Sequence, residues 1–264
     1  MSESEMNYSS YLQVEKLLDL QDPKSDPVEH DELLFIIIHQ VYELWFRQML
    51  HEIDKVKTDF SDGELFGAIA AFQRLRTIMK TLVGQLDILE TMTPLSFSAF
   101  RSRLESASGF QSLQFREFEF VLGFKRPHVM QYIEPDWPGV DRVQRRLREP
   151  SVVDHFYDFL EHRGIEIPAE VKQNRGKPLA TQPNDAVQQS LLMLYKDAPE
   201  VAILLELMID FDEGLQEWRY RHVKLVERTI GAKQGTGGSP GVEFLKKSLF
   251  KSIFPDLWAI RHEF

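Results

Sequence analysis

The sequence contains no cysteine in 264 residues, and basic residues are in the minority, with 31 Lys and Arg against 41 Asp and Glu. The lack of cysteine excludes disulfides, iron–sulfur clusters, zinc–thiolate sites and thiol nucleophiles, and it fits a reducing cytoplasm. The net charge of −10 argues against a surface for nucleic acid or anionic membrane. The longest apolar run, 33–38, is too short to span a bilayer. The first ten residues, MSESEMNYSS, are too acidic and polar for a secretory signal. We therefore expect a soluble, cytoplasmic protein without nucleic-acid or membrane partners.

Alternation with a period of two is missing from every segment, and so are internal repeats and heptads. Apolar residues recur instead at spacings of three and four, which predicts an all-α protein. The expected helices cover residues 11–20, 28–60, 63–92, 110–122, 140–148, 152–162, 186–196, 199–230 and 242–250, with a short helix at Phe97 and Arg101 and an undecided tail at 254–264.

One stretch has little helical periodicity. Residues 164–184 contain three prolines, which predicts a long loop. Two candidate site residues, His39 and His222, lie on opposite sides of it. Because a shared site would need both sides, we expect one domain over residues 1–264.

The stretch 217–239 carries the first indication of a site. His222 falls on the apolar face of the predicted helix, and GTGGS follows at 235–239, where glycines allow a backbone to approach a ligand closely. His39 lies one turn after Phe35 on an apolar stripe of the longest helix. Each signal is weak alone, because a histidine on an apolar face is more often a hydrogen-bonded core residue, and GTGGS lacks the lysine of a phosphate loop.

Two inward histidines without cysteine favour a metal or a haem. None of the eight histidines has a glutamate three residues before it, as a di-iron bundle requires, and His51-Glu52 lacks the second histidine of a zincin. No nucleophile elbow is present, although composition does not exclude a Ser-His-Asp arrangement. A haem with His222 as axial ligand and a second imidazole opposite fits best. The residues alone therefore predict a helical protein, and haem is the preferred interpretation of its site.

Five motifs, in order along residues 7–245, resemble those of the tryptophan 2,3-dioxygenase family. They are YSSYL at 8–12, HDELLFIIIHQ at 30–40 with ELW at 43–45, SGFQSLQFR at 108–116, WRYRH at 218–222 and GTGGS at 235–239. The resemblance implies a helical homotetramer with one haem b per subunit. It also implies that the enzyme opens the indole 2,3-bond of L-tryptophan with O2 to give N-formylkynurenine, the first step of the kynurenine pathway.

The resemblance also implies roles around the cofactor. His222 matches the axial ligand of the haem iron, and Gly235 and Gly237 match the glycine-rich loop beside the haem. His39 matches the distal catalytic histidine, which accepts the indole N–H. Whether His39 acts as a base or as an anchor stays open.

A second set of roles concerns the substrate. Phe35 matches an aromatic wall of the indole pocket, and Arg101 matches the arginine that grips the carboxylate, as a planar two-pronged donor can. Thr236 matches a threonine that hydrogen-bonds the amino-acid end. Phe97 stands where some members have a tyrosine, so one hydrogen bond to the carboxylate is missing here.

The N-terminal segment 1–20 is expected to act outside its own chain. Tyr8, Tyr11 and Leu12 match residues that a neighbouring subunit contributes to the pocket. The amphipathic helix expected there has no partner of its own, and two prolines separate it from the rest.

Other functions remain open at this point. A haem enzyme of the same fold could act on another indole or a tryptophan derivative, although Arg101 with Thr236 favours a free amino-acid end. A non-enzymatic haem carrier or sensor would need no carboxylate clamp. A helical bundle without haem is the third alternative.

Overall fold

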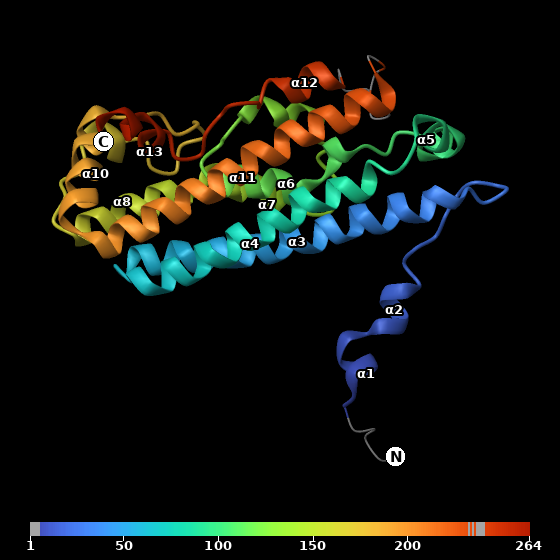
Figure 1. Ribbon diagram of the computed structural model, residues 1–264, viewed down its shortest axis with the longest axis horizontal. Coiled ribbons are helices and arrows are strands. Elements are labelled where there is room, and N and C mark those ends of the chain that lie inside the picture. Colours follow the sequence, from blue (N-terminus) through green and yellow to red (C-terminus); the bar gives the residue numbers. More distant parts are fainter. Residues whose placement is uncertain (1–5, 232, 234, 236–240) are drawn as a thin grey trace.

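The computed structural model describes residues 6–231, 233, 235 and 241–264. Three long helices run side by side along the molecule: α3 (His30–Ser61), α4 (Leu65–Leu89) and α11 (Pro199–Ile230) (Figure 1). Helix α4 packs against both α3 and α11. At the α4–α11 crossing, a Cβ added to Gly214 would lie 2.9 Å from Cγ of Met79, so any larger residue would force the Met79 side chain to shift. The three helices form the frame on which the remaining elements pack.

Shorter helices surround this frame. Helices α6 (Leu113–Val121) and α8 (Val152–His162) pack on α3, and α7 (Val140–Arg148) packs on α6. Helices α10 (Asp185–Asp197), α12 (Val242–Lys246) and α13 (Pro255–Ala259) contact α11. The other short elements are α5 (Pro94–Arg101), α9 (Ala169–Lys172), η1 (Ser102–Leu104), η2 (Gly109–Gln111), η3 (Pro127–Tyr132) and η4 (Ile260–Glu263).

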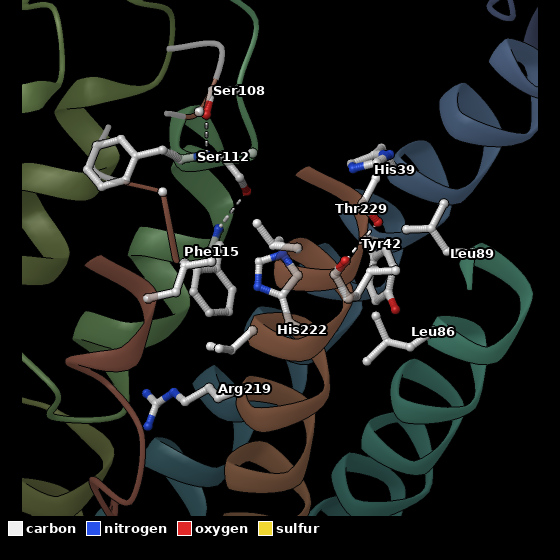
Figure 2. A pocket seen from close by; sticks show the side chains of 18 of the residues that line it. His39, Tyr42, Leu86, Leu89, Ser108, Ser112, Phe115, Arg219, His222 and Thr229 are labelled. Carbon is white, nitrogen blue, oxygen red and sulfur yellow. Dashed lines mark hydrogen bonds between the residues drawn. The ribbon is translucent and has the colours of Figure 1, made fainter. Parts of the chain in front are cut away.

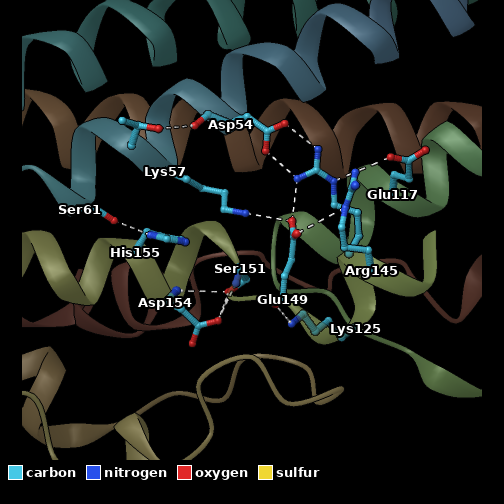
Figure 3. A network of polar contacts seen from close by, with 12 residues as sticks. Asp54, Lys57, Ser61, Glu117, Lys125, Arg145, Glu149, Ser151, Asp154 and His155 are labelled. Atoms are coloured by element: carbon cyan, nitrogen blue, oxygen red, sulfur yellow. Dashed lines mark hydrogen bonds and ion pairs between the residues drawn. The ribbon is translucent and has the colours of Figure 1, made fainter. Parts of the chain in front are cut away.

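A polar network ties α3 to α7 and to the start of α8 (Figure 3). The Arg146 guanidinium donates to both carboxylate oxygens of Asp54 at 2.6 Å and to Glu149 at 2.7 Å. Lys57 of α3 reaches the same Glu149 carboxylate at 3.0 Å. Ser151 caps α8 through a hydrogen bond from the Asp154 amide. Because every charge here has a close partner, we interpret the network as structural: it holds these helices together.

The N-terminal segment leaves the body of the molecule (Figure 1). The expected single helix over 11–20 is wrong: two short helices form, α1 (Tyr8–Leu12) and α2 (Val14–Leu18). Gln13 between them has a left-handed backbone, with φ at 55°, which interrupts the helical hydrogen bonds. A chain that buries none of its apolar side lacks the packing that normally keeps a helix continuous.

Other boundaries show the effect of capping. Helix α6 begins at Leu113, later than expected, because the Ser112 hydroxyl accepts the Phe115 amide at 3.1 Å. The expected loop 164–184 includes the one-turn helix α9, and Arg175 fixes it with two hydrogen bonds to Asp158, at 2.7 and 2.8 Å. Helix α12 ends at Lys246, four residues short of the expectation. The predictions for 140–148, 152–162 and 199–230 match the observed helices.

The described residues contain helices and no strands, so the all-α prediction is confirmed. Among these residues, no helix combines the length and the apolar character needed to cross a membrane.

Candidate active site

A cavity of about 290 Å³ opens between α3 and α11 at the end of the bundle near α5 and α12. Its walls also include residues of α4 and α6 and the segment before α6. Apolar side chains dominate the wall: Phe35, Phe46, Leu86, Leu89, Met92, Phe97, Phe115 and Val223 are among them. A largely apolar cavity with a few polar groups is the usual form of a cofactor or substrate site.

His222 enters this cavity from α11 (Figure 2). Its ring stacks on Trp218, one turn earlier, with ring centroids 5.1 Å apart and planes 5° apart. Burial, together with the smaller effects of the nearby His39 and Arg116, lowers the pKa of His222 to about 4. The ring is therefore neutral at neutral pH. No described residue hydrogen-bonds to it, so a nitrogen lone pair is available to a ligand in the cavity.

His39 lines the cavity from α3, on a different side from His222 (Figure 2). Its Nδ1 lies 2.7 Å from the carbonyl oxygen of Phe35. Because a carbonyl can only accept, Nδ1 carries the proton and Nε2 is left as an acceptor. Burial lowers the pKa of His39, although the hydrogen bond to Phe35 and the charge of Glu43 oppose this. His39 is thus a neutral imidazole with one free acceptor nitrogen.

An aromatic wall stands beside His39. The Phe35 ring lies 4.2 Å from the His39 ring, 5.7 Å from the Phe97 ring and 5.5 Å from the Phe100 ring, measured between centroids. These tilted and edge-on contacts hold Phe35 in place. The wall can contact the face of a flat aromatic ligand.

Arg101 lies at the end of α5, four residues after Phe97, and both side chains line the cavity. Helix α5 begins at Pro94, where the Thr93 hydroxyl caps it by accepting the Ser96 amide at 3.0 Å. The cap and the helix fix the direction in which Arg101 projects. A guanidinium at this position can pair with a ligand carboxylate.

The ligating groups suit a haem better than a bare metal ion. Among the described residues, no group of three or more His, Asp or Glu side chains could hold a metal ion. A haem brings four ligands of its own and needs one neutral imidazole from the protein, which His222 can supply. The residues present therefore fit a haem b.

Comparison with known proteins agrees with this geometry. The model of the family described as tryptophan 2,3-dioxygenase matches residues 1–163 and 170–263. The chain is 52% identical to the tryptophan 2,3-dioxygenase of Herpetosiphon aurantiacus, over 97% of each chain. It is 49% identical to that of Anaeromyxobacter dehalogenans, over 97% of this chain and 95% of the relative, and 40% identical to that of Kineococcus radiotolerans, over 98% and 91%. The chain belongs to this family.

The structure brings most of the predicted site residues of this tryptophan 2,3-dioxygenase family member together. The cavity wall contains Phe35, His39, Phe97, Arg101, His222 and Gly235. Thr236 and Gly237 lie outside the described residues. Tyr8, Tyr11 and Leu12 are not part of the wall of their own chain, and they are 77%, 70% and 47% exposed.

Several polar groups of the site were not predicted from the sequence. Gln114 donates to the Glu43 carbonyl at 3.0 Å and to its carboxylate at 2.8 Å, which joins α6 to α3 beside the cavity. Arg116 and Glu119 also line the cavity although both are buried. A signal was present in FREFEF at 115–120, where charged residues stand between phenylalanines, so a helix cannot bury the aromatic rings without burying charge as well.

Proposed function

We propose that the protein is a haem-dependent dioxygenase that opens the indole 2,3-bond of L-tryptophan with O2 and produces N-formylkynurenine. The supporting observation is the pair of neutral histidines, His39 and His222, that line one apolar cavity from two helices. Membership in the tryptophan 2,3-dioxygenase family supports the same reaction. The product begins the degradation of tryptophan by the kynurenine pathway.

The cofactor would be one haem b per subunit, and His222 would hold its iron. When bound, the haem supplies the activation of O2. Gly235, which lines the cavity, allows the backbone to approach the cofactor closely, and we assign the same role to Gly237 by resemblance.

The chain's own residues orient the substrate. His39 accepts the indole N–H at Nε2, since its Nδ1–H is already bound to the Phe35 carbonyl. This tautomer makes His39 an anchor that stays neutral. Phe35 contacts the face of the indole and excludes water from it. Such groups contribute to the reaction by holding the reacting atoms in one geometry.

The amino-acid end is held by charge and hydrogen bonds. Arg101 pairs with the substrate carboxylate, and Thr236 is assigned to the amino-acid end by resemblance. Phe97 has no hydroxyl, so on α5 the carboxylate depends on Arg101 alone. A desolvated carboxylate–guanidinium pair discriminates strongly against analogues that lack the carboxylate.

We also propose a homotetramer in which residues 1–20 complete the site of a neighbouring subunit. The support is the exposure of Tyr8, Tyr11 and Leu12, because large apolar groups of this kind are rarely left uncovered together. Deletion of residues 1–20 should weaken tryptophan binding and leave the haem spectrum unchanged, as measured by titration and sedimentation. A monomeric parent, or unchanged tryptophan affinity in the truncated protein, would refute this assembly.

One domain over residues 1–264, located in the cytoplasm, is part of the same proposal. The cavity supports a single domain, because helices from both sides of residues 164–184 line it. Helices α3–α6 precede that segment, and α11 and α12 follow it.

Turnover tests the proposed reaction. The purified, reduced protein is mixed with L-tryptophan and O2, and N-formylkynurenine is followed by its absorbance, with tryptamine as the matched substrate without a carboxylate. We expect product from tryptophan and very little from tryptamine. A haem-loaded protein that forms no N-formylkynurenine would reject the proposed function.

A further inference from the structure

Four charged side chains line the cavity that also contains His222, and three of them are buried. Arg116 and Glu119 come from α6, Arg126 follows that helix, and Arg219 comes from α11 (Figure 2 labels Arg219 and His222). Arg116, Glu119 and Arg219 are 5%, 1% and 3% exposed. Three guanidinium groups against one carboxylate leave two positive charges in excess. We call these four residues the arginine cluster.

Glu119 lies at the centre of the arginine cluster. Both of its carboxylate oxygens accept from Arg126 at 2.7 Å, and it also accepts from Arg116. Nη2 of Arg219 lies 3.7 Å from the carboxylate, while its Nη1 donates to the carbonyl of Lys251 at 2.8 Å. Burial alone would raise the pKa of Glu119, but the three arginines lower it below its usual range. Glu119 is therefore ionised, and it cancels one of three positive charges.

No described residue cancels the remaining charge fully. Asp212 of α11 is the acid that acts on Arg219 besides Glu119. Its carboxylate is already occupied by the amides of Ile253 and Phe254 at 2.8 and 3.1 Å and by the Trp258 indole at 2.9 Å. Burial raises the pKa of Asp212, which weakens the acid as a counter-charge.

Little water can screen the arginine cluster. The guanidinium of Arg116 lies 4.9 Å from the Phe115 ring centroid, and those of Arg126 and Arg219 lie 4.6 and 4.7 Å from the Phe124 centroid. The buried Nε atoms of all three arginines and Nη2 of Arg219 have no acceptor among the described residues. In such surroundings, a charge acts over a longer distance than it would in water.

The field of the arginine cluster reaches His222. Arg219 precedes His222 by three residues on α11, so both side chains lie on the same side of the helix. Arg116 and Arg219 line the same cavity as His222. The positive charge thus lies on the wall of the cavity that His222 enters.

We infer that the arginine cluster is a fixed positive charge that favours the reduced state of the haem iron held by His222. The inference rests on the proposed function, because it requires a haem at His222. Reduction of a ferric haem adds one electron, supplied by an external one-electron donor, and lowers the positive charge of the iron–porphyrin core by one. A nearby cation therefore opposes the ferric state more than the ferrous state. One unit charge about 10 Å away, at an effective dielectric of about 20, changes the equilibrium constant for reduction about tenfold.

A redox titration of haem-loaded protein, followed by absorbance, tests this inference. Arg116→Gln removes one cation and leaves Glu119 paired with Arg126. It should lower the equilibrium constant for reduction about tenfold, which is about 59 mV toward lower midpoint potential for one electron. Glu119→Gln removes the only carboxylate of the cluster and should shift the potential in the opposite direction. Arg228→Gln is the control, since that side chain is 60% exposed, pairs with Glu90 on the surface and lies on the same helix as His222.

The two opposite signs make the test decisive. Unchanged potentials, or shifts of the same sign in both variants, would refute the inference. If Arg116→Gln does not retain haem, Arg126→Gln replaces it, with the same expected sign. Weaker haem binding in the arginine variants with no change in potential would mean that the cluster binds the carboxylates of the haem, which also refutes the inference.

Failure of the inference and failure of the proposed function are distinguishable. A parent protein that takes up no haem, or that carries haem and leaves tryptophan intact, would reject the proposed function. A parent that cleaves tryptophan and has variants with unchanged potentials would reject only the role of the arginine cluster.

Discussion

The two ends of the bundle use the same three long helices in different ways. At the end near α8, phenylalanines of α3, α4, α8 and α11 meet in a filled core, and Phe60 has ring centroids 6.2 Å from Phe72 and 5.5 Å from Phe159. We call this the filled end. At the other end, near α5, the same helices surround a cavity of about 290 Å³ with His39 and His222 on its wall, and we call it the hollow end. Since side chains normally fill interiors closely, the contrast indicates that one end provides stability and the other is built to enclose a ligand.

Replacement of His222 should have the largest effect at the hollow end. His222→Ala removes the only protein ligand that we assign to the iron, so haem content and turnover should fall together to near zero. The free energy of unfolding of the haem-free protein should change by no more than about 1 kcal/mol, because the ring lies at a cavity wall. Haem absorbance per protein gives the haem content, and urea unfolding gives the free energy of unfolding. A variant with full haem content and activity would show that His222 is not the iron ligand.

Phe60→Ala, at the filled end, should lower stability and leave haem binding unchanged. Phe60 is completely buried, so its truncation should lower the free energy of unfolding by about 3–5 kcal/mol. Haem stoichiometry should be unchanged at low denaturant. Phe66→Ala, on a side chain that is 75% exposed, is the matched control and should change stability little. A Phe60 variant that keeps its stability and loses haem would contradict the division between the two ends.

Arg101→Lys tests the clamp at the rim of the hollow end. The charge remains but the planar fork is lost, so transition-state binding of tryptophan should weaken by about 2–4 kcal/mol. The haem spectrum should not change. Arg103→Lys, two residues later at an exposed position, is the control. If the parent turns over tryptamine as well as tryptophan, Arg101 is not the carboxylate clamp.

His39→Ala should have a smaller effect, because the contacts that we propose for Phe35 and Arg101 would still orient the substrate. One hydrogen bond from a neutral indole N–H contributes about 1 kcal/mol, which is about fivefold in kcat/KM. Haem should remain bound. Complete loss of haem from this variant would show that His39 is an iron ligand or a residue of the core.

The pH dependence is the finest test of the hollow end. Burial lowers the pKa of His39, so the neutral form, with Nε2 as acceptor, persists as the pH falls through the ordinary value of 6.5. We expect kcat/KM for tryptophan to stay level through that pH and to decline only below it. The His39→Ala variant should lack this acid limb. An acid limb in the parent centred at or above 6.5 would contradict the neutral anchor.

Helical spacing in the sequence predicted the filled end and much of the frame. The range of α11 and the inward direction of His222 follow from apolar residues three and four apart, and the family follows from five motifs. The left-handed Gln13 could not be predicted, since an amphipathic pattern does not show whether a helix finds a partner. The tautomer of His39 depends on its distance from the Phe35 carbonyl.

The arginine cluster also could not be predicted from the sequence, because it depends on contacts between helices. Glu119 and Arg219 are 100 positions apart, and only the packing of α6 beside α11 makes them neighbours. Charges within one helix can be paired by spacing, but pairs between helices depend on tertiary contacts.

The most direct measurement is a haem titration of the haem-free parent and of His222→Gly, with and without added imidazole. It tests whether the hollow end holds a haem through His222. We predict that the parent binds one haem per chain with the spectrum of an imidazole-ligated iron. The glycine variant should lose that spectrum and recover it when imidazole is added. Imidazole-independent binding with the parental spectrum in His222→Gly would contradict the account.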